Sequence, residues 1–284
     1  MSDSCLIRAA ELASRLADAD LAIVDCRFDL GDVDWGRRQH AAGHVPRALH
    51  AALDTALAGP VMPHTGRHPL PAPEAFATTL AGLGIGPTTA VVAYDQGHGA
   101  GAARLRWMLK AVGHAAPVRV LDGGIAAWLA GGHPVETEDA RRPAAQVPVR
   151  PFAGWLSATE VAAGLDDGSI QLVDARGADR FAGQNETIDP VAGHVPGALN
   201  RPFLQNLGAD GCFKPSAELR QEWEALLGEP DASRVVAMCG SGITACQNLL
   251  ALEIAGLAGG RLYAGSWSEW IRDAARPVAT GPAS

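Results

Sequence analysis

The sequence predicts an α/β protein made of two similar domains in tandem, each a parallel sheet with helices on both faces. The chain has 284 residues, which suits one large domain or two of ordinary size. Its second half repeats phrases of its first half. Within each half, short apolar runs alternate with helical patterns, and this alternation is typical of a parallel sheet covered by helices on both faces.

Four phrases occur twice in the same order, and the starts of the paired phrases are 149, 150, 144 and 142 residues apart. The pairs are LAIVDCRF with IQLVDARG, AAGHVPRALH with VAGHVPGALN, VVAYDQGHG with VVAMCGSGI, and LDGGIAAWL with YAGSWSEWI. A period this long indicates duplicated globular domains rather than a solenoid. We expect one domain over residues 1–138, a proline-punctuated linker over 139–155 and a second domain over 156–284.

Local signals place the elements of the second copy. Ser157 and Glu160 form a capping box, which marks the start of a helix. The apolar run that contains Val173 predicts a strand, and the recurrence of Ala245, Leu249 and Leu252 at helical spacing predicts a helix. We expect helices over 158–164, 216–227 and 244–257, and strands over 171–175 and 234–238.

The composition excludes several classes of protein. Apolar residues make up 48% of the chain and charged residues 19%, which argues against disorder. The formal net charge is −8, and no basic run suggests a nucleic-acid partner. No stretch approaches the length of a membrane-spanning helix. The first residues lack the basic start and uniform apolar stretch of a secretory signal, so we expect a cytoplasmic protein.

The five cysteines, Cys5, Cys26, Cys212, Cys239 and Cys246, predict free thiols in a reducing compartment. Their number is odd, and a chain of this length does not need disulfides to be stable. No pattern of Cys and His has the spacing of a zinc site. We therefore expect neither a metal nor a cofactor.

Cys239 follows an apolar run directly, at the carboxyl end of a predicted strand, where functional groups of open α/β sheets gather. Gly240 and Gly242 let the backbone turn tightly, and successive N–H groups in such a turn form an anion-binding nest. The nest and the following helix favour the thiolate, which is the nucleophilic form. A lone cysteine at a strand end is more often a small core residue. The equivalent position in the first copy is Asp95, so we expect this position to face solvent or a cleft in both copies.

The two-copy layout, together with VDAR, GHVPGA, CGSGITA and GSWSEW, resembles the two-domain rhodanese-type sulfurtransferases over almost the whole chain. The resemblance is closest to the 3-mercaptopyruvate branch. It implies a non-catalytic first domain and a catalytic second domain with Cys239 as the sulfur carrier. It also implies a persulfide intermediate, a small-molecule sulfur donor, and an acceptor that is a thiol, such as thioredoxin, or cyanide. The covalent intermediate predicts ping-pong kinetics.

The same resemblance implies 3-mercaptopyruvate as the donor, with thiosulfate as the alternative. Thiosulfate is a dianion, and no Lys or Arg follows Cys239 directly. Ser241 either donates a proton to the substrate or only fills a tight turn. Arg180 matches an arginine that binds the substrate carboxylate, a task that suits a planar guanidinium. The family often has a second arginine nine residues later, where this chain has Asp189.

Further site residues follow from the resemblance. Gly240, Gly242, Ile243 and Thr244 form the substrate-binding loop around Cys239. His44 matches a histidine with Ser and Asp partners, with Asp32 and Asp34 as candidates for the Asp. The equivalent residue in the second copy is His194, which indicates instead that both histidines only hold their loops in place. Arg67 and His68 lie on a proline-flanked loop, which either lines the mouth of a cleft or is solvated. Arg176 is expected in a structural ion pair, and Cys246, Trp267 and Trp270 in packing.

Two other functions compete with sulfur transfer. A cysteine phosphatase needs an arginine at the sixth position after its nucleophile, and this chain has Ala245 there. A non-enzymatic, rhodanese-like binding module would not need Cys239 at all. The presence of both the thiol and its glycine-spaced turn in the second copy favours an enzyme.

Overall fold

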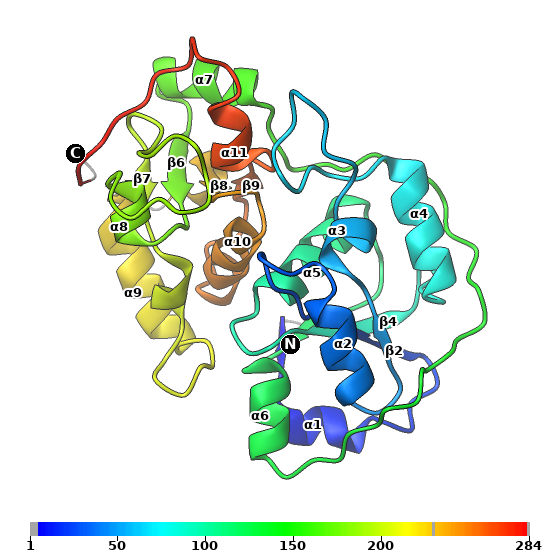
Figure 1. The fold of residues 1–284 in the computed structure, drawn as a ribbon. Coiled ribbons are helices and arrows are strands. Elements are labelled where there is room, and N and C mark those ends of the chain that lie inside the picture. The colour runs from blue at the N-terminus through cyan, green and yellow to red at the C-terminus, as the bar shows by residue number, and fades with distance from the viewer. Residues whose placement is uncertain (1–4, 229–230, 283–284) are drawn as a thin grey trace. The chain divides into compact units, whose positions relative to one another are not determined.

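The computed structural model describes residues 5–228 and 231–282, which fold into two compact units (Figure 1). Unit 1 contains the chain up to Gly59, Leu70–Ala153 and Ala209–Phe213, and unit 2 contains Pro60–Pro69, Gly154–Gly208 and the chain from Lys214. Each unit therefore includes a short segment from the other half of the sequence. No helix among the described residues is long and apolar enough to span a membrane.

Unit 1 is built on a parallel sheet with strand order β1-β5-β4-β2-β3. Its elements in chain order are β1 (Leu6–Ile7), α1 (Ala9–Ser14), β2 (Leu21–Asp25), α2 (Trp35–Ala42), β3 (Ala48–His50), α3 (Leu53–Ala56), α4 (Pro73–Gly82), β4 (Ala90–Tyr94), α5 (Ala100–Ala111), β5 (Val118–Leu121) and α6 (Gly124–Ala130). At least one helix lies between each strand and the next along the chain, as parallel pairing requires, and α6 follows the last strand, β5.

Unit 2 repeats this plan with strand order β7-β6-β8-β9, again with parallel pairing throughout. Its elements are α7 (Ala158–Asp166), β6 (Gln171–Asp174), α8 (Ala178–Phe181), β7 (Leu199–Asn200), the 3₁₀ helix η1 (Phe203–Asn206), α9 (Ser216–Leu227), the 3₁₀ helix η2 (Ala232–Arg234), β8 (Val235–Met238), α10 (Thr244–Ile254), β9 (Arg261–Leu262) and α11 (Ser266–Trp270). Trp155 pairs with Leu262 and extends the sheet by one bridge.

Side chains of successive strand residues point to opposite faces of the sheet. In β8, Val236 and Met238 join a buried apolar cluster with Val161 of α7 and Trp267 of α11. The alternate residues face the side where α10 contacts β8 and β9. The sheet of unit 2 is thus covered by helices on both faces, as predicted, and Trp267 and Trp270 pack in its core.

The predicted elements of the second copy are present with small shifts at their ends. The capping box of Ser157 and Glu160 is formed and opens α7. Helix α9 has the predicted bounds, whereas α10 stops at Ile254 and not at Leu257. Gly256 adopts a φ of 74°, a left-handed conformation that ends the helix three residues earlier than the apolar pattern does.

A buried ion pair closes the end of the equivalent strand in each unit. Arg176 donates from Nη2 to the Asp174 carboxylate at 2.7 Å and to the Gly193 carbonyl at 2.8 Å. Arg27 makes the same two contacts in unit 1, with Asp25 and the Gly43 carbonyl. The expected structural role of Arg176 is confirmed.

Candidate active site

Cys239 lies in the loop that joins β8 to α10, and the backbone of this loop is turned toward its sulfur. The Gly242 N–H donates to Cys239 Sγ over 3.0 Å. The carbonyl groups of Cys239 and Gly240 accept hydrogen bonds from the N–H groups of Trp267 and Ser268, at 3.0 and 2.9 Å. These two bonds anchor the loop against the start of α11, and the Gly242 N–H is a donor that stabilises a negative charge on the sulfur.

Gly242 is required by this geometry. Its φ is 81°, and a Cβ at this position would lie 2.3 Å from the Ala264 carbonyl oxygen. No other residue type fits both the left-handed conformation and this close approach. Cys246 packs behind the loop, as expected, and its thiol donates to the Gly242 carbonyl over 3.3 Å.

The equivalent loop of unit 1 holds a carboxylate where unit 2 holds the thiol. Asp95 Oδ1 accepts from the N–H groups of Gly97 and Gly99, and Oδ2 accepts from the Gly101 N–H, at 2.9–3.0 Å. The expectation that this position faces solvent or a cleft in both copies is wrong for unit 1, because Asp95 is fully buried, whereas Cys239 is 2% exposed. Three backbone donors make burial of the carboxylate tolerable, and they show that this loop is an anion nest.

The segment Pro60–Pro69 belongs to unit 2 and brings two side chains to the thiol loop. Its backbone lies so close to the Gly265 carbonyl oxygen that a Cβ on Gly66 would be 2.4 Å away. The Arg67 N–H donates to Ser268 Oγ over 3.0 Å. The next residue, His68, is buried, and its Nδ1 lies 2.7 Å from Ser241 Oγ. A hydroxyl hydrogen-bonded to an imidazole can give and recover a proton.

Two guanidinium groups converge over Gly240, the residue next to Cys239. A Cβ on Gly240 would lie 2.9 Å from Arg67 Nη2 and 3.9 Å from Arg180 Nη1 and Nη2. The absence of a side chain at Gly240 thus leaves room for both cations. Positive charge beside the nest favours an anionic substrate group at this place.

Two buried carboxylates hold these guanidinium groups. Glu186 accepts from Arg180 Nε and Nη2, with a shortest contact of 2.8 Å. Asp189 binds both cations: Arg67 Nη1 at one oxygen, and Arg180 Nη2 at the other over 3.2 Å. Burial raises the pKa of Asp189 despite the two guanidinium groups. Burial acts in the same direction on Glu186, but hydrogen bonds from Arg180 and from the N–H groups of Asp189 and Ile188 outweigh it and lower its pKa.

The histidine that bonds Ser241 is His68. His44 lies fully buried in unit 1, where its Nδ1–H donates to the His40 carbonyl and its ring stacks on His40. His194 does the same in unit 2 with Phe181.

The two candidate Asp partners of His44 are engaged elsewhere. Asp32 pairs with Arg38 and Asp34 with Arg37, both on the surface. The matched hydrogen bonds of His44 and His194 correspond to the bracing interpretation of these histidines.

The remaining predicted loop residues lie where the sequence placed them. Ile243 is buried and precedes α10, and Thr244 is the first residue of that helix. Among the described residues, no group of three or more His, Cys, Asp or Glu side chains could hold a metal ion.

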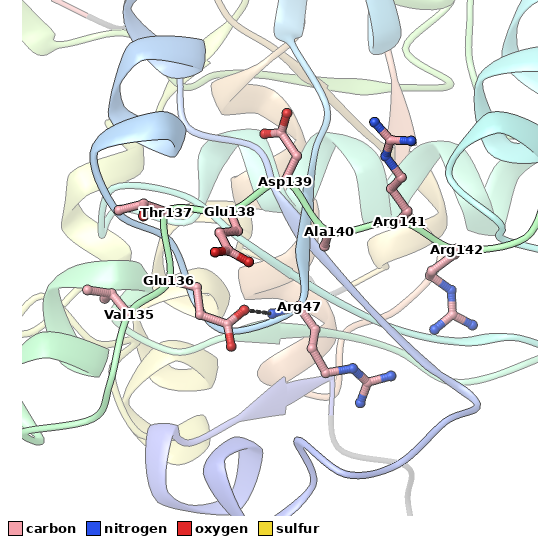
Figure 2. Close-up of a pocket in the computed structure, with 9 residues that line it drawn as sticks. All are labelled: Arg47, Val135, Glu136, Thr137, Glu138, Asp139, Ala140, Arg141 and Arg142. Atoms are coloured by element: carbon pink, nitrogen blue, oxygen red, sulfur yellow. Dashed lines mark hydrogen bonds between the residues drawn. The ribbon is translucent and has the colours of Figure 1, made fainter.

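Unit 1 also has an open cavity of about 540 Å³, away from the Asp95 loop in sequence (Figure 2). Its lining consists of Arg47 and the run Val135–Arg142. The Arg47 N–H donates to Glu136 Oε2 over 3.0 Å, and Arg142 Nη1 donates to the Leu21 carbonyl over 2.9 Å. Along the run the acidic Glu136, Glu138 and Asp139 precede the basic Arg141 and Arg142, and the lining includes neither a thiol nor an imidazole.

Comparison with known proteins adds independent evidence. The family described as "Rhodanese-like domain" matches residues 8–131 and 157–273. The chain is 46% identical, over 99% of its length and all of the relative's, to a Pseudomonas aeruginosa protein named "Probable 3-mercaptopyruvate sulfurtransferase". It is 35% identical to the thiosulfate sulfurtransferase of Bos taurus, over 89% of this chain and 86% of the relative.

Two solved structures are similar over nearly the whole chain. The 3-mercaptopyruvate sulfurtransferase from Leishmania major matches with a TM-score of 0.85 and 34% identity, over 95% of this chain and 75% of that one. SseA from Escherichia coli, described as a 3-mercaptopyruvate sulfotransferase with the rhodanese fold, matches with a TM-score of 0.81 and 30% identity, over 94% of this chain and all of that one.

Proposed function

The chain belongs to the rhodanese family and is a sulfurtransferase, and we propose that Cys239 carries sulfur as a persulfide from 3-mercaptopyruvate to a thiol or to cyanide. One observation carries the proposal: the Gly242 N–H points at Cys239 Sγ in a loop whose copy in unit 1 holds an anion. A nest of this kind stabilises both the thiolate and the persulfide anion.

In the first step, the Cys239 thiolate attacks the sulfur of 3-mercaptopyruvate. A new S–S bond forms, the C–S bond breaks, and its electron pair passes to the substrate carbon as the enolate of pyruvate. The sulfur keeps its proton, so the enolate needs one from another source. Ser241 Oγ, 2.7 Å from His68 Nδ1, is placed to donate to the enolate and to recover a proton from the imidazole.

In the second step, the acceptor attacks the outer sulfur of the persulfide. A thiolate acceptor forms its own persulfide, cyanide forms thiocyanate, and the S–S bond to Cys239 breaks to restore the thiolate. Thioredoxin is an acceptor of the thiol class in this proposal. All five cysteines are free thiols, which supports a cytoplasmic location.

The guanidinium groups over Gly240 support a binding place for the anionic group of the donor beside Cys239. Arg180 binds the carboxylate of 3-mercaptopyruvate, and the loop of Gly240, Gly242, Ile243 and Thr244 binds the substrate at the reacting sulfur, to which the Gly242 N–H donates. No basic residue follows Cys239 in the loop, which favours a monoanionic donor. Thiosulfate is the second candidate, because Arg67 adds a second cation from a distant segment.

The two halves of the chain have different roles in this proposal. The first domain, residues 1–138, is non-catalytic in that its own loop holds no nucleophile: Asp95 stands in place of the thiol and its carboxylate fills the nest. Its segment Pro60–Pro69 packs in unit 2 and supplies His68 to the site there. The second domain, residues 156–284, is catalytic, and residues 139–155 link the two. For His44 the bracing role is favoured over a catalytic one, because its hydrogen bond to the His40 carbonyl matches that of His194 to the Phe181 carbonyl.

The test is sulfur loading of Cys239. Intact-protein mass spectrometry after incubation with 3-mercaptopyruvate should show the gain of one sulfur, which cyanide removes and Cys239→Ser abolishes. Comparison of kcat/KM for the two donors then decides between them. If Cys239→Ser retains transfer activity, or if no sulfur is gained from either donor, the proposal is wrong.

A further inference from the structure

Asp189 occupies the position between the two cations beside the reactive loop. One of its oxygens contacts Arg67 and the other contacts Arg180, and its side chain is 2% exposed. The guanidinium groups themselves are 27% and 20% exposed. The anion is thus buried behind the cations, and the cations are what an incoming donor meets.

The charges of this cluster cancel. Arg67 and Arg180 contribute two positive charges, and Asp189 and Glu186 contribute two negative charges when ionised. Glu186 is committed to Arg180 through two nitrogen atoms, to Arg176 Nη1 over 3.6 Å and to the backbone through two N–H groups, and the charge of Arg176 is itself balanced by Asp174. Asp189 is therefore the carboxylate that links the two cations and sets the charge they present together.

We propose that Asp189 is a specificity-determining residue that holds Arg67 and Arg180 over Gly240 and limits their net charge, so that donors with one negative charge are preferred to dianions. This inference rests on the proposed sulfur transfer at Cys239. A second charge on the donor gains attraction from the cations but meets the opposing field of the buried carboxylate, which solvent screens poorly. A neutral side chain at position 189 removes that opposing field.

Asp189→Asn in the full-length protein is the direct test, with kcat/KM measured for 3-mercaptopyruvate and for thiosulfate. The ratio of thiosulfate to 3-mercaptopyruvate activity should rise about tenfold, which is the size expected when one nearby charge in a partly buried site is removed. The increase should shrink at high salt, because thiosulfate attraction is then screened. A merely structural role of Asp189 would lower both activities together and leave the ratio unchanged.

Two variants serve as controls. Asp189→Glu keeps the charge and should keep the donor preference of the unaltered protein, even if both rates fall. Asp167→Asn removes an exposed carboxylate before β6, at the opposite end of the strands from Cys239, and should leave the ratio unchanged. A rise in the ratio with Asp167→Asn would attribute the effect to overall charge and overturn the proposal.

A binding measurement separates this inference from the proposed function. Pyruvate and sulfate, a monoanion and a dianion that carry no transferable sulfur, are tested for protection of Cys239 against iodoacetamide. Asp189→Asn should increase protection by sulfate about tenfold relative to protection by pyruvate. If sulfur transfer occurs but neither ratio changes, the role of Asp189 is refuted alone. If transfer fails but sulfate protection increases, the proposed function is refuted and the charge role of Asp189 stands.

Discussion

His68 Nδ1 lies 2.7 Å from Ser241 Oγ, although 173 positions separate the two residues in the chain. The contact forms because Pro60–Pro69 packs as part of unit 2, with the Arg67 N–H bonded to Ser268. It gives the loop after Cys239 a hydroxyl whose proton can be replenished by an imidazole. The first half of the sequence thereby contributes to the chemistry of the second.

The His68–Ser241 pair is expected to protonate the leaving group of donors that release an enolate, such as 3-mercaptopyruvate. Ser241→Ala and His68→Gln should each lower kcat with 3-mercaptopyruvate by about 100-fold, since both remove the same proton transfer. The double variant should be no slower than either single variant. Thiosulfate leaves as sulfite without a proton at carbon, so its turnover should fall much less. Steady-state kinetics with both donors tests this, and additive losses would contradict a joint role.

Gly242→Ala should both destabilise unit 2 and abolish transfer. The alanine must adopt a φ of 81° with its Cβ 2.3 Å from the Ala264 carbonyl oxygen, so the backbone has to move. Gly168→Ala is the matched control, because Gly168 has a φ of 70° with nothing within 4 Å of a Cβ. Gly168→Ala should lower the free energy of unfolding by about 1–2 kcal/mol and keep full transfer activity. Urea unfolding and the transfer assay distinguish the two, and equal behaviour would mean that the close contact with Ala264 is unimportant.

Asp95→Asn should destabilise unit 1 by about 3 kcal/mol, because the amide cannot accept all the backbone hydrogen bonds of the nest and places donors against donors. Asp29→Asn is a suitable comparison in the same unit. Asp29 is exposed and accepts one bond from the Gly31 N–H, so its loss should cost less than about 0.5 kcal/mol. Thermal unfolding measures both. A stability loss for Asp95→Asn no larger than that of Asp29→Asn would show that the nest needs no anion.

Acid should weaken unit 1 through Asp25. Burial opposes ionisation of this carboxyl, but hydrogen bonds from His40 and Arg27 outweigh burial and lower its pKa from 3.8 to about 2. Because its pKa is lowered, the ionised Asp25 carboxylate stabilises the fold fully at pH values above its ordinary pKa of 3.8. This stabilisation is lost as the pH falls toward about 2. The loss should amount to about 2 kcal/mol. Unfolding free energies between neutral pH and this range measure it. Asp25→Asn should be less stable at neutral pH and should lack this part of the acid dependence.

Cys212 should react slowly with iodoacetamide although it is partly exposed. Burial and the carboxylates of Asp122 and Asp210 raise the pKa of Cys212 to about 11. Its alkylation rate should therefore rise about tenfold with each pH unit through the range from 7 to 10. Peptide mass spectrometry at a series of pH values gives the rate, with free cysteine as the reference that levels off above about pH 8.5. A plateau of the Cys212 rate near pH 8 would contradict the effect of the two carboxylates.

Local patterns were enough to predict much of the fold. The repeated phrases identified the duplication, because equivalent segments keep their spacing of strand, turn and helix. The capping box at Ser157 and the strand before Cys239 were readable because hydrogen bonds to near neighbours and a continuous apolar run depend on adjacent residues. Gly242 was singled out as a turn residue for the same reason. The end of α10 was missed, since Gly256 stops the helix within a run that is still apolar.

The sequence by itself thus determined the two-copy architecture, the glycine-spaced loop at Cys239 and the family of proteins to which the chain is similar. Only the tertiary structure decided that His68 bonds Ser241, that Arg67 stands beside Arg180, and that Asp189 lies between these two cations. The physical reason is the range of the interactions. Turns and helix starts are set within a few residues, whereas these contacts depend on how Pro60–Pro69 packs on a unit more than 80 residues further along the chain.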